Sequence, residues 1–179
     1  GSALGYSTYL GVGSLECPGD LSVPFYNCGI EVDAQGQAYL VGTSGSSDFP
    51  TTPGAYDTSY NGGWDAVVTV LNTTGTAAVY GTYLGGSGDE YGISLGRDAA
   101  GNVYVSGQTL SEDFPVTPGA IGPAYLGQGD VFVARLPADL ATLTYATYLG
   151  GHDYDCIYFS CWLAVDAAAV RQGSPGGEQ

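Results

Sequence analysis

Short apolar runs separated by turn-forming residues are the dominant pattern of the chain. Between residues 93 and 149 there are four such runs, rich in the β-branched and aromatic residues that favour strands. Turn residues at Asp98–Gly101 and Pro137–Leu140 are predicted to join neighbouring runs as hairpins. The predicted strands are Ile93–Arg97, Asn102–Gly107, Asp130–Leu136 and Leu143–Leu149. We therefore expect a four-stranded antiparallel unit.

Several of these runs are apolar at successive positions, where a half-exposed strand would alternate. Val131–Ala134 and Ala66–Val70 are examples. Strands of this kind suit a sheet that is covered on both faces, and neighbouring sheets stacked like the blades of a propeller would provide that cover. The predicted fold class is all-β, with propeller-type four-stranded antiparallel blades.

The unit is repeated along the chain. The segment Asp-Phe-Pro-Thr-Thr-Pro-Gly-Ala at residues 48–55 returns with one change at residues 113–120. The tetrapeptide Thr-Tyr-Leu-Gly begins at Thr8, Thr82 and Thr147, so its copies lie 74 and 65 residues apart. The common offset between the two complete copies is 65 residues, since 113 minus 48 and 147 minus 82 both give that value. This offset defines equivalent positions in the two repeats.

These motifs resemble those of a known family. The hairpin sequence Asp-Ala-Ala-Gly-Asn-Val-Tyr-Val-Ser-Gly at 98–107, the two Asp-Phe-Pro-x-Thr-Pro-Gly-Ala segments and the run Gly-Asp-Val-Phe-Val-Ala-Arg-Leu at 129–136 are similar to the bacterial SBBP family of β-propeller repeat proteins. The resemblance extends to about Asp166. It implies a propeller-like fold in a secreted or cell-surface protein, and it implies no catalytic residues.

The two complete repeats are flanked by partial ones. A lone fourth strand is predicted at Tyr6–Leu10 and a lone first strand at Trp162–Asp166, and two repeats cannot close a ring of typically 4–8 blades. Exposed edge strands tend to pair, so head-to-tail association into a ring or filament is one expectation, and a fragment of a longer propeller is the other. The predicted divisions are an N-terminal strand and insertion loop at 1–28, repeats at 29–86 and 87–151, and a partial repeat with a flexible tail at 152–179.

Charge narrows the classes of partner. The formal net charge of −15 arises from 18 acidic residues against three arginines. Phosphate backbones and anionic membranes would be repelled, and no segment approaches the ~20 apolar residues of a membrane-spanning helix. We expect neither nucleic-acid binding nor membrane insertion.

All four cysteines lie in two insertions relative to the repeat. Their spacing contains no CxxC metal or redox motif, so disulfides in an oxidising compartment are predicted. One arrangement closes each insertion loop locally, and the other joins the loops of two subunits. The local pairs would be Cys17 with Cys28 and Cys156 with Cys161.

Candidate catalytic and metal-binding chemistry is sparse. His152 is the single histidine, and neither a zinc motif such as HExxH nor a GxSxG nucleophile elbow is present. No catalytic residue and no cofactor is predicted. The acids of two equivalent loops remain as weak calcium-ligand candidates: Asp89, Glu90, Asp153 and Asp155.

Glycans are a second class of partner. Trp64 and Trp162 offer aromatic faces on which sugar rings could stack, and Asn72-Thr73-Thr74 forms an N-glycosylation sequon in a predicted turn. The expected function is that of a non-enzymatic, extracellular or cell-surface structural or adhesive protein that associates with copies of itself through edge strands. A carbohydrate-binding module is the alternative, and a hydrolase is a weaker one.

Overall fold

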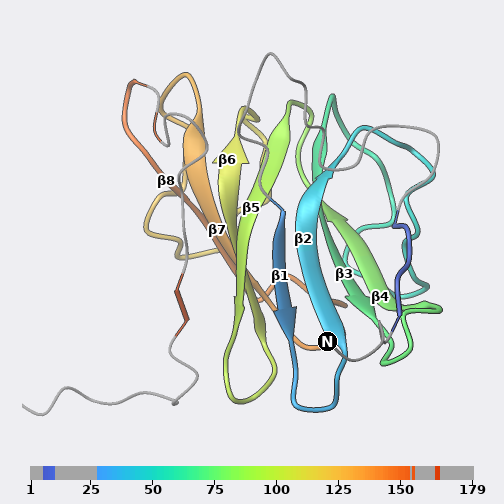
Figure 1. Ribbon diagram of the computed structural model, residues 1–179. Coiled ribbons are helices and arrows are strands. Elements are labelled where there is room, and N and C mark those ends of the chain that lie inside the picture. Colours follow the sequence, from blue (N-terminus) through green and yellow to red (C-terminus); the bar gives the residue numbers. More distant parts are fainter. Residues whose placement is uncertain (1–5, 11–27, 154, 156–163, 166–179) are drawn as a thin grey trace, which may run out of the picture.

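Two four-stranded antiparallel sheets make up the computed structural model, which describes residues 6–10, 28–153, 155 and 164–165 (Figure 1). In each sheet the strands follow one another in chain order, joined by antiparallel pairing. The first sheet contains β1 (Gly29–Val32), β2 (Ala38–Ser44), β3 (Asp65–Leu71) and β4 (Ala78–Leu84). The second contains β5 (Glu90–Arg97), β6 (Val103–Thr109), β7 (Asp130–Leu136) and β8 (Tyr145–Leu149). The predicted all-β class and the four-stranded antiparallel sheets are confirmed.

The strand boundaries differ little from the predicted ones. β7 has the predicted bounds, while β5 begins three residues earlier, at Glu90 where Ile93 was predicted. The early start reflects pairing with β6, because Glu90 and Tyr91 lie opposite Thr109 and Gln108. The Glu90 N–H also donates to the carbonyl oxygen of Trp64 at 2.5 Å. No helix among the described residues is both long and apolar enough to span a membrane.

An aspartate and a glycine shape the first hairpin of each sheet. Asp98 Oδ1 accepts hydrogen bonds from the backbone N–H groups of Ala100 and Asn102, at 3.0 and 2.9 Å. Gly101 has a φ of 84°, a left-handed conformation that glycine adopts without steric cost. Asp33 and Gly36 play the same parts in the first sheet, where Gly36 has a φ of 89°.

The proline-containing loops run along the outer strand of each sheet. In the first sheet the Thr52 N–H donates to the Gly81 carbonyl oxygen of β4, and the Tyr83 N–H donates to Asp57. The second sheet repeats this pattern on β8, where Thr117 donates to Ala146 and Tyr148 donates to Gly122. The outer edges of β4 and β8 are therefore already paired by their own loops, which satisfies backbone groups that an edge strand would otherwise expose.

The prediction of a strand at Tyr6–Leu10 is wrong. These residues lie outside any strand, and Leu10 packs across the face of the first sheet against Phe49, Val67 and Tyr83. A strand requires a ladder partner, and the outer edge of β4 is occupied by its loop. At the other end, Ala164 and Val165 are the two described residues of the predicted strand Trp162–Asp166, and they also lie outside any strand.

The main hydrophobic core lies between the two sheets. β5 contacts β1, β2 and β3, so the second sheet packs on one face of the first (Figure 1). Val41, Val68 and Leu84 of the first sheet share this core with Val105 and Phe132 of the second. Burial of apolar side chains from both sheets is the main force that holds them together.

Candidate interaction faces

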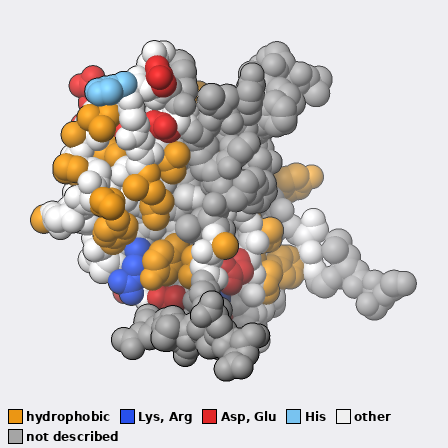
Figure 2. All heavy atoms as spheres, turned by 90° about the vertical axis from the view of Figure 1, so that its left-hand side faces the viewer, with side chains coloured by type: hydrophobic (Ala, Val, Ile, Leu, Met, Phe, Trp, Pro, Cys, Tyr) orange, Lys and Arg blue, Asp and Glu red, His pale blue; other side chains and the backbone are white. Residues whose placement is uncertain are grey.

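Each sheet has a second face that points away from the shared core. On the outer face of the second sheet, Val131 and Val133 are only half-buried and Leu149 is 45% exposed. We call this surface, made by Val131, Val133, Arg135 and Leu149, the Leu149 face. Figure 2 views the β7–β8 side of the molecule and shows hydrophobic side chains gathered there, with basic side chains at the lower end.

Comparison of the two repeats shows that no described sheet covers the Leu149 face. Leu149 is equivalent to Leu84, which is fully buried because the second sheet covers it. Val133 is likewise equivalent to the fully buried Val68. The same positions are thus core in one sheet and surface in the other, and the difference is the sheet stacked on top.

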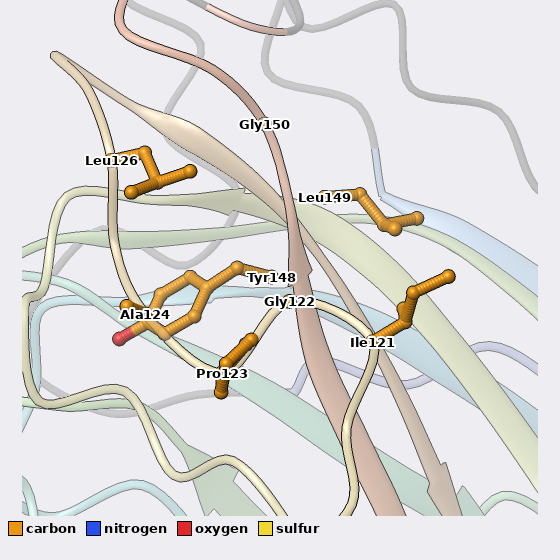
Figure 3. A pocket seen from close by; sticks show the side chains of 8 residues that line it. All are labelled: Ile121, Gly122, Pro123, Ala124, Leu126, Tyr148, Leu149 and Gly150. Carbon is orange, nitrogen blue, oxygen red and sulfur yellow. The ribbon is translucent and has the colours of Figure 1, made fainter.

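A cavity of about 340 Å³ adjoins the Leu149 face. It lies between β8 and the loop at 121–126, and Figure 3 shows the side chains that line it. Ile121 and Leu149 project toward the same side of β8, and Ile121 is 77% exposed. The complete lining is Ile121, Gly122, Pro123, Ala124, Leu126, Tyr148, Leu149 and Gly150.

The equivalent place on the first sheet is filled by the second. Tyr56, which is equivalent to Ile121, packs against the core, and its N–H donates to the Leu140 carbonyl oxygen at 2.8 Å. Leu140 is fully buried with a φ of 51°, a strained conformation for leucine that this packing holds in place.

The outer face of the first sheet is the counterpart surface. We call it the Ile30 face, made by Ile30, Val32, Leu40 and Val67. Ile30 is 67% exposed, and Leu10 from the N-terminal segment covers the Val67 end of the face.

These positions have buried equivalents in the second sheet. Leu40 is equivalent to Val105 and Val67 to Phe132, and both of those second-sheet residues are fully buried in the core. The Ile30 face therefore has the pattern of a surface that packs on another sheet.

An arginine connects the two sheets at the end of β5. The guanidinium carbon of Arg97 lies 3.8 Å from the centroid of the Tyr39 ring, and its Nη2 lies 4.0 Å from Asp33 Oδ2. Arg135 contacts the equivalent residues of the second sheet, Tyr104 and Asp98, but it does so from β7 of the same sheet. Arg97 is thus an intersheet contact and Arg135 an intrasheet one.

The loop acids predicted as calcium ligands have separate surroundings. Glu90 is fully buried, and its Oε2 accepts a hydrogen bond from the Gly86 N–H at 2.7 Å. Asp155 Oδ2 accepts one from the Gly151 N–H at 2.6 Å, while Asp153 is exposed. Asp89 lies within 3.4 Å of the Tyr91 hydroxyl. Across the described ranges, no three His, Cys, Asp or Glu side chains come together as a metal-binding group.

The structure places the other candidate residues as follows. His152 is exposed, and its Nδ1 lies 3.1 Å from the Leu126 carbonyl oxygen. Trp64 is half-buried, with its ring against Gly45. Asn72 lies in the β3–β4 turn, where its Oδ1 accepts a hydrogen bond from the Thr76 N–H. Trp162 lies outside the described residues.

One of the four cysteines is described. Cys28 is disulfide-bonded. Cys17, Cys156 and Cys161 lie outside the described part of the chain, so the two pairing schemes stay predictions.

Sequence analysis did not identify two acidic residues that occupy equivalent positions in the two repeats. Asp65 and Asp130, the first residues of β3 and β7, are fully buried. Their signal was present, since an aspartate recurs there at the 65-residue offset ahead of an apolar run.

Among the described residues, two stacked antiparallel sheets built from one repeated unit, with partly exposed apolar residues on both outer faces, define an all-β repeat protein. Residues 79–115 match the model of the SBBP family, a beta-propeller repeat, and this confirms the family resemblance. The matched segment covers most of β4, all of β5 and β6, and the start of the following loop, so it spans both sheets. No curated protein matches the chain.

Proposed function

We propose that this chain is a non-enzymatic structural or adhesive protein of the extracellular space or cell surface. Its sheets act as propeller-type blades, and copies associate head to tail through the Leu149 face of one and the Ile30 face of the next. The observation that carries the proposal is the repeat relation between these faces. Leu149 and Val133 are open, whereas their equivalents Leu84 and Val68 are buried under the second sheet.

In this proposal, copies associate through the faces of their sheets and not through edge strands. The edge-strand mechanism expected from the sequence required a free N-terminal strand, but Tyr6–Leu10 lies outside any strand and the outer edges of β4 and β8 are paired by loops. In face stacking, Ile30 and Val67 of one copy would take the positions that Leu95 and Phe132 hold within the chain. Association would require displacement or rearrangement of Leu10.

The contact is heterologous, because it joins two different surfaces. Such a contact closes into a ring if its rotation divides a full turn and otherwise grows into a filament. Val165 already lies against the Leu149-face side of β5, since a Cβ atom on Gly96 would be 2.6 Å from its Cγ2. The start of a third unit thus approaches this side of the sheet.

Structural roles of the polar residues support a non-enzymatic function. Glu90 and Asp155 accept hydrogen bonds from backbone N–H groups at the same position of the two repeats. His152 contacts the carbonyl oxygen of Leu126. These interactions shape the loops between successive units.

The test is solution mass by light scattering on wild type and two matched variants. Leu149→Asp places a charge on the Leu149 face, and Ala99→Asp adds the same charge at an exposed hairpin tip. Burying an unpaired charge opposes association, so Leu149→Asp should weaken it at least about tenfold while Ala99→Asp leaves it unchanged.

The outcomes separate the possible partners. Rings or filaments that Leu149→Asp dissolves would support the proposal, and dissolution by reductant would add the intersubunit disulfides. A wild-type protein that stays monomeric at high concentration would overturn self-association. The open faces would then be left for further repeats of a longer chain.

A further inference from the structure

Two buried carboxyl groups meet where the first sheet leads into the second. Asp65 begins β3 and Glu90 begins β5, and both residues are fully buried. A Cβ atom on Gly85 would lie 2.5 Å from Asp65 Oδ1 and 2.5 Å from Glu90 Oε2. The two oxygens therefore lie on the same side of Gly85, no more than 5.0 Å apart, where a side chain larger than that of glycine would collide with both.

The same arrangement occurs one repeat later. Asp130 begins β7, and a Cβ atom on Gly150 would lie 2.4 Å from Asp130 Oδ1 and 2.6 Å from Asp155 Oδ2. The Asp155 N–H donates to the Gly129 carbonyl oxygen, as the Glu90 N–H does to that of Trp64. A carboxyl pair thus marks the start of each following unit.

One oxygen of each strand aspartate lacks a hydrogen-bond partner. Asp65 Oδ2 accepts the Asn61 N–H at 2.8 Å, and Asp130 Oδ2 accepts the Leu126 N–H at 3.0 Å. Both Oδ1 atoms are buried and unpartnered. A buried polar atom without a partner is costly, and an ionised carboxylate can only accept hydrogen bonds.

Glu90, the other member of the first pair, accepts hydrogen bonds at both of its carboxylate oxygens. Its Oε2 accepts the Gly86 N–H at 2.7 Å, and its Oε1 accepts the Thr109 hydroxyl at 2.6 Å. Hydrogen bonds of this kind stabilise the ionised form of a carboxyl group. Burial raises the pKa of Glu90 as well, but these hydrogen bonds lower it, whereas Asp65 Oδ1 has no donor. The proton of the pair is therefore placed on Asp65.

We propose that each pair shares one proton, carried on Oδ1 of Asp65 or Asp130 and directed at the carboxylate of Glu90 or Asp155. The proton turns an unpartnered acceptor into a donor and removes one of two like charges. Burial, with the charge of Glu90 as a further contribution, raises the pKa of Asp65 to about 7. Burial and the charge of Asp155 likewise raise the pKa of Asp130.

The surrounding charges favour protonation at the first pair. Besides Glu90, Asp57 and Asp89 act on Asp65 and raise its pKa. The hydroxyls of Tyr60 and Tyr83 also lie within electrostatic range.

At the second pair, Asp155 and Tyr148 are the ionisable neighbours of Asp130. His152, in the loop after β8, lies beside the carbonyl oxygen of Leu126, whose N–H donates to Asp130. The described arginines, Arg97 and Arg135, form ion pairs with other acids, namely Asp33 and Asp98.

A calcium ion is the competing explanation for two facing acids. Calcium takes six to eight oxygen ligands. Over the residues that the structure describes, no third acid, histidine or cysteine joins either pair. A proton needs only the two oxygens that are present.

The shared proton makes the fold sensitive to pH near neutrality. The pKa of Asp65 is raised in the folded state above its unfolded value of 3.8, so the folded chain holds a proton that the unfolded chain has lost. Stability from this group is therefore complete below about pH 3.8, falls as the pH rises toward about 7, and is lost above that pH. Ordinary carboxyl groups are already ionised near neutrality, and comparison with the asparagine variants separates the pairs from the single histidine.

The experiment is urea unfolding of the full chain across neutral pH, in buffer containing a chelator. For the first pair alone, the unfolding equilibrium constant should rise about 30-fold between about pH 5.5 and pH 8.5. Asp65→Asn and Asp130→Asn keep a hydrogen-bond donor without a titrating proton. Each should flatten the pH dependence and be more stable than wild type at the alkaline end, whereas Asp89→Asn should keep the wild-type slope.

Three results would overturn the inference. The first is a wild-type stability that does not change with pH, and the second is that both asparagine variants are less stable than wild type at every pH. The third is stabilisation of the wild type by added calcium chloride that both variants lose, which would assign the pairs to a cation. All of these readouts concern unfolding, so they are separate from the light-scattering test of self-association.

Discussion

Replacement of Arg97 by alanine is the sharpest test of how the two sheets are joined. The guanidinium group of Arg97 lies 3.8 Å from the Tyr39 ring centroid and 4.0 Å from Asp33, and its side chain is only 15% exposed. A cation over an aromatic face contributes about 1–2 kcal/mol when desolvated, and an ion pair of this kind contributes up to about 1 kcal/mol. We expect Arg97→Ala to lower the free energy of unfolding by about 2 kcal/mol.

The second repeat supplies the matched control. Arg135 lies 5.7 Å from the Tyr104 ring centroid, its side chain is 35% exposed, and both of its contacts are within one sheet. Arg135→Ala should therefore cost only about 0.5–1 kcal/mol, since a longer and more solvated contact contributes less. Both variants remove one positive charge, so a general charge effect would affect them equally.

Thermal and urea unfolding followed by tyrosine fluorescence would measure the difference. A loss of about 2 kcal/mol corresponds to a fall in Tm of roughly 4–8 °C for a chain of this size. A double-mutant cycle with Tyr39→Leu should give a coupling energy near 1 kcal/mol. If Arg97→Ala proves no more harmful than Arg135→Ala, the intersheet clamp does not contribute as argued.

Two further predictions concern the loops and the packing of strands. Tyr83→Phe removes a buried hydroxyl that bonds two backbone groups of the proline-containing loop, so it should cost about 1–3 kcal/mol in urea unfolding, while Tyr9→Phe, at a fully exposed position, should cost nothing measurable. Gly107→Ala would place a Cβ atom 2.0 Å from the Tyr91 carbonyl oxygen and should lower stability by at least about 2 kcal/mol. Gly151→Ala meets no atom within 4 Å, and an equal loss there would contradict the packing argument.

The sequence was sufficient to identify equivalent positions in the two repeats, because short-range sequence patterns specify the turns and strands of each repeat. The Asp98–Gly101 turn and the apolar run at Asp130–Leu136 are short-range patterns, and the structure has a hairpin and a strand at those places. The equivalence of Tyr83 and Tyr148 was also readable, and both are buried in the structure. Tyr9 carries the same motif but is fully exposed, because its part of the chain does not pair as a strand.

The candidate site was less accessible to sequence reasoning. Glu90 and Asp155 were singled out as loop acids, but their partners Asp65 and Asp130 lie 25 residues earlier in each case and were not. Contacts across such a separation depend on how strands return to one another, which no local pattern states. The pairing of the β4 and β8 edges was not predicted for the same reason, since the loops that cover them are distant in sequence.

What the sequence determined by itself is the repeating unit: its β-class, its period, its turns and the equivalence of its residues, all of which follow from short-range chemistry. Which copy of each residue is buried follows instead from the stacking of the two sheets. Leu84 and Leu149 have the same motif and the same strand position, yet one is core and the other is 45% exposed. The physical reason is that burial depends on whether another sheet lies on that face, and stacking joins residues far apart along the chain.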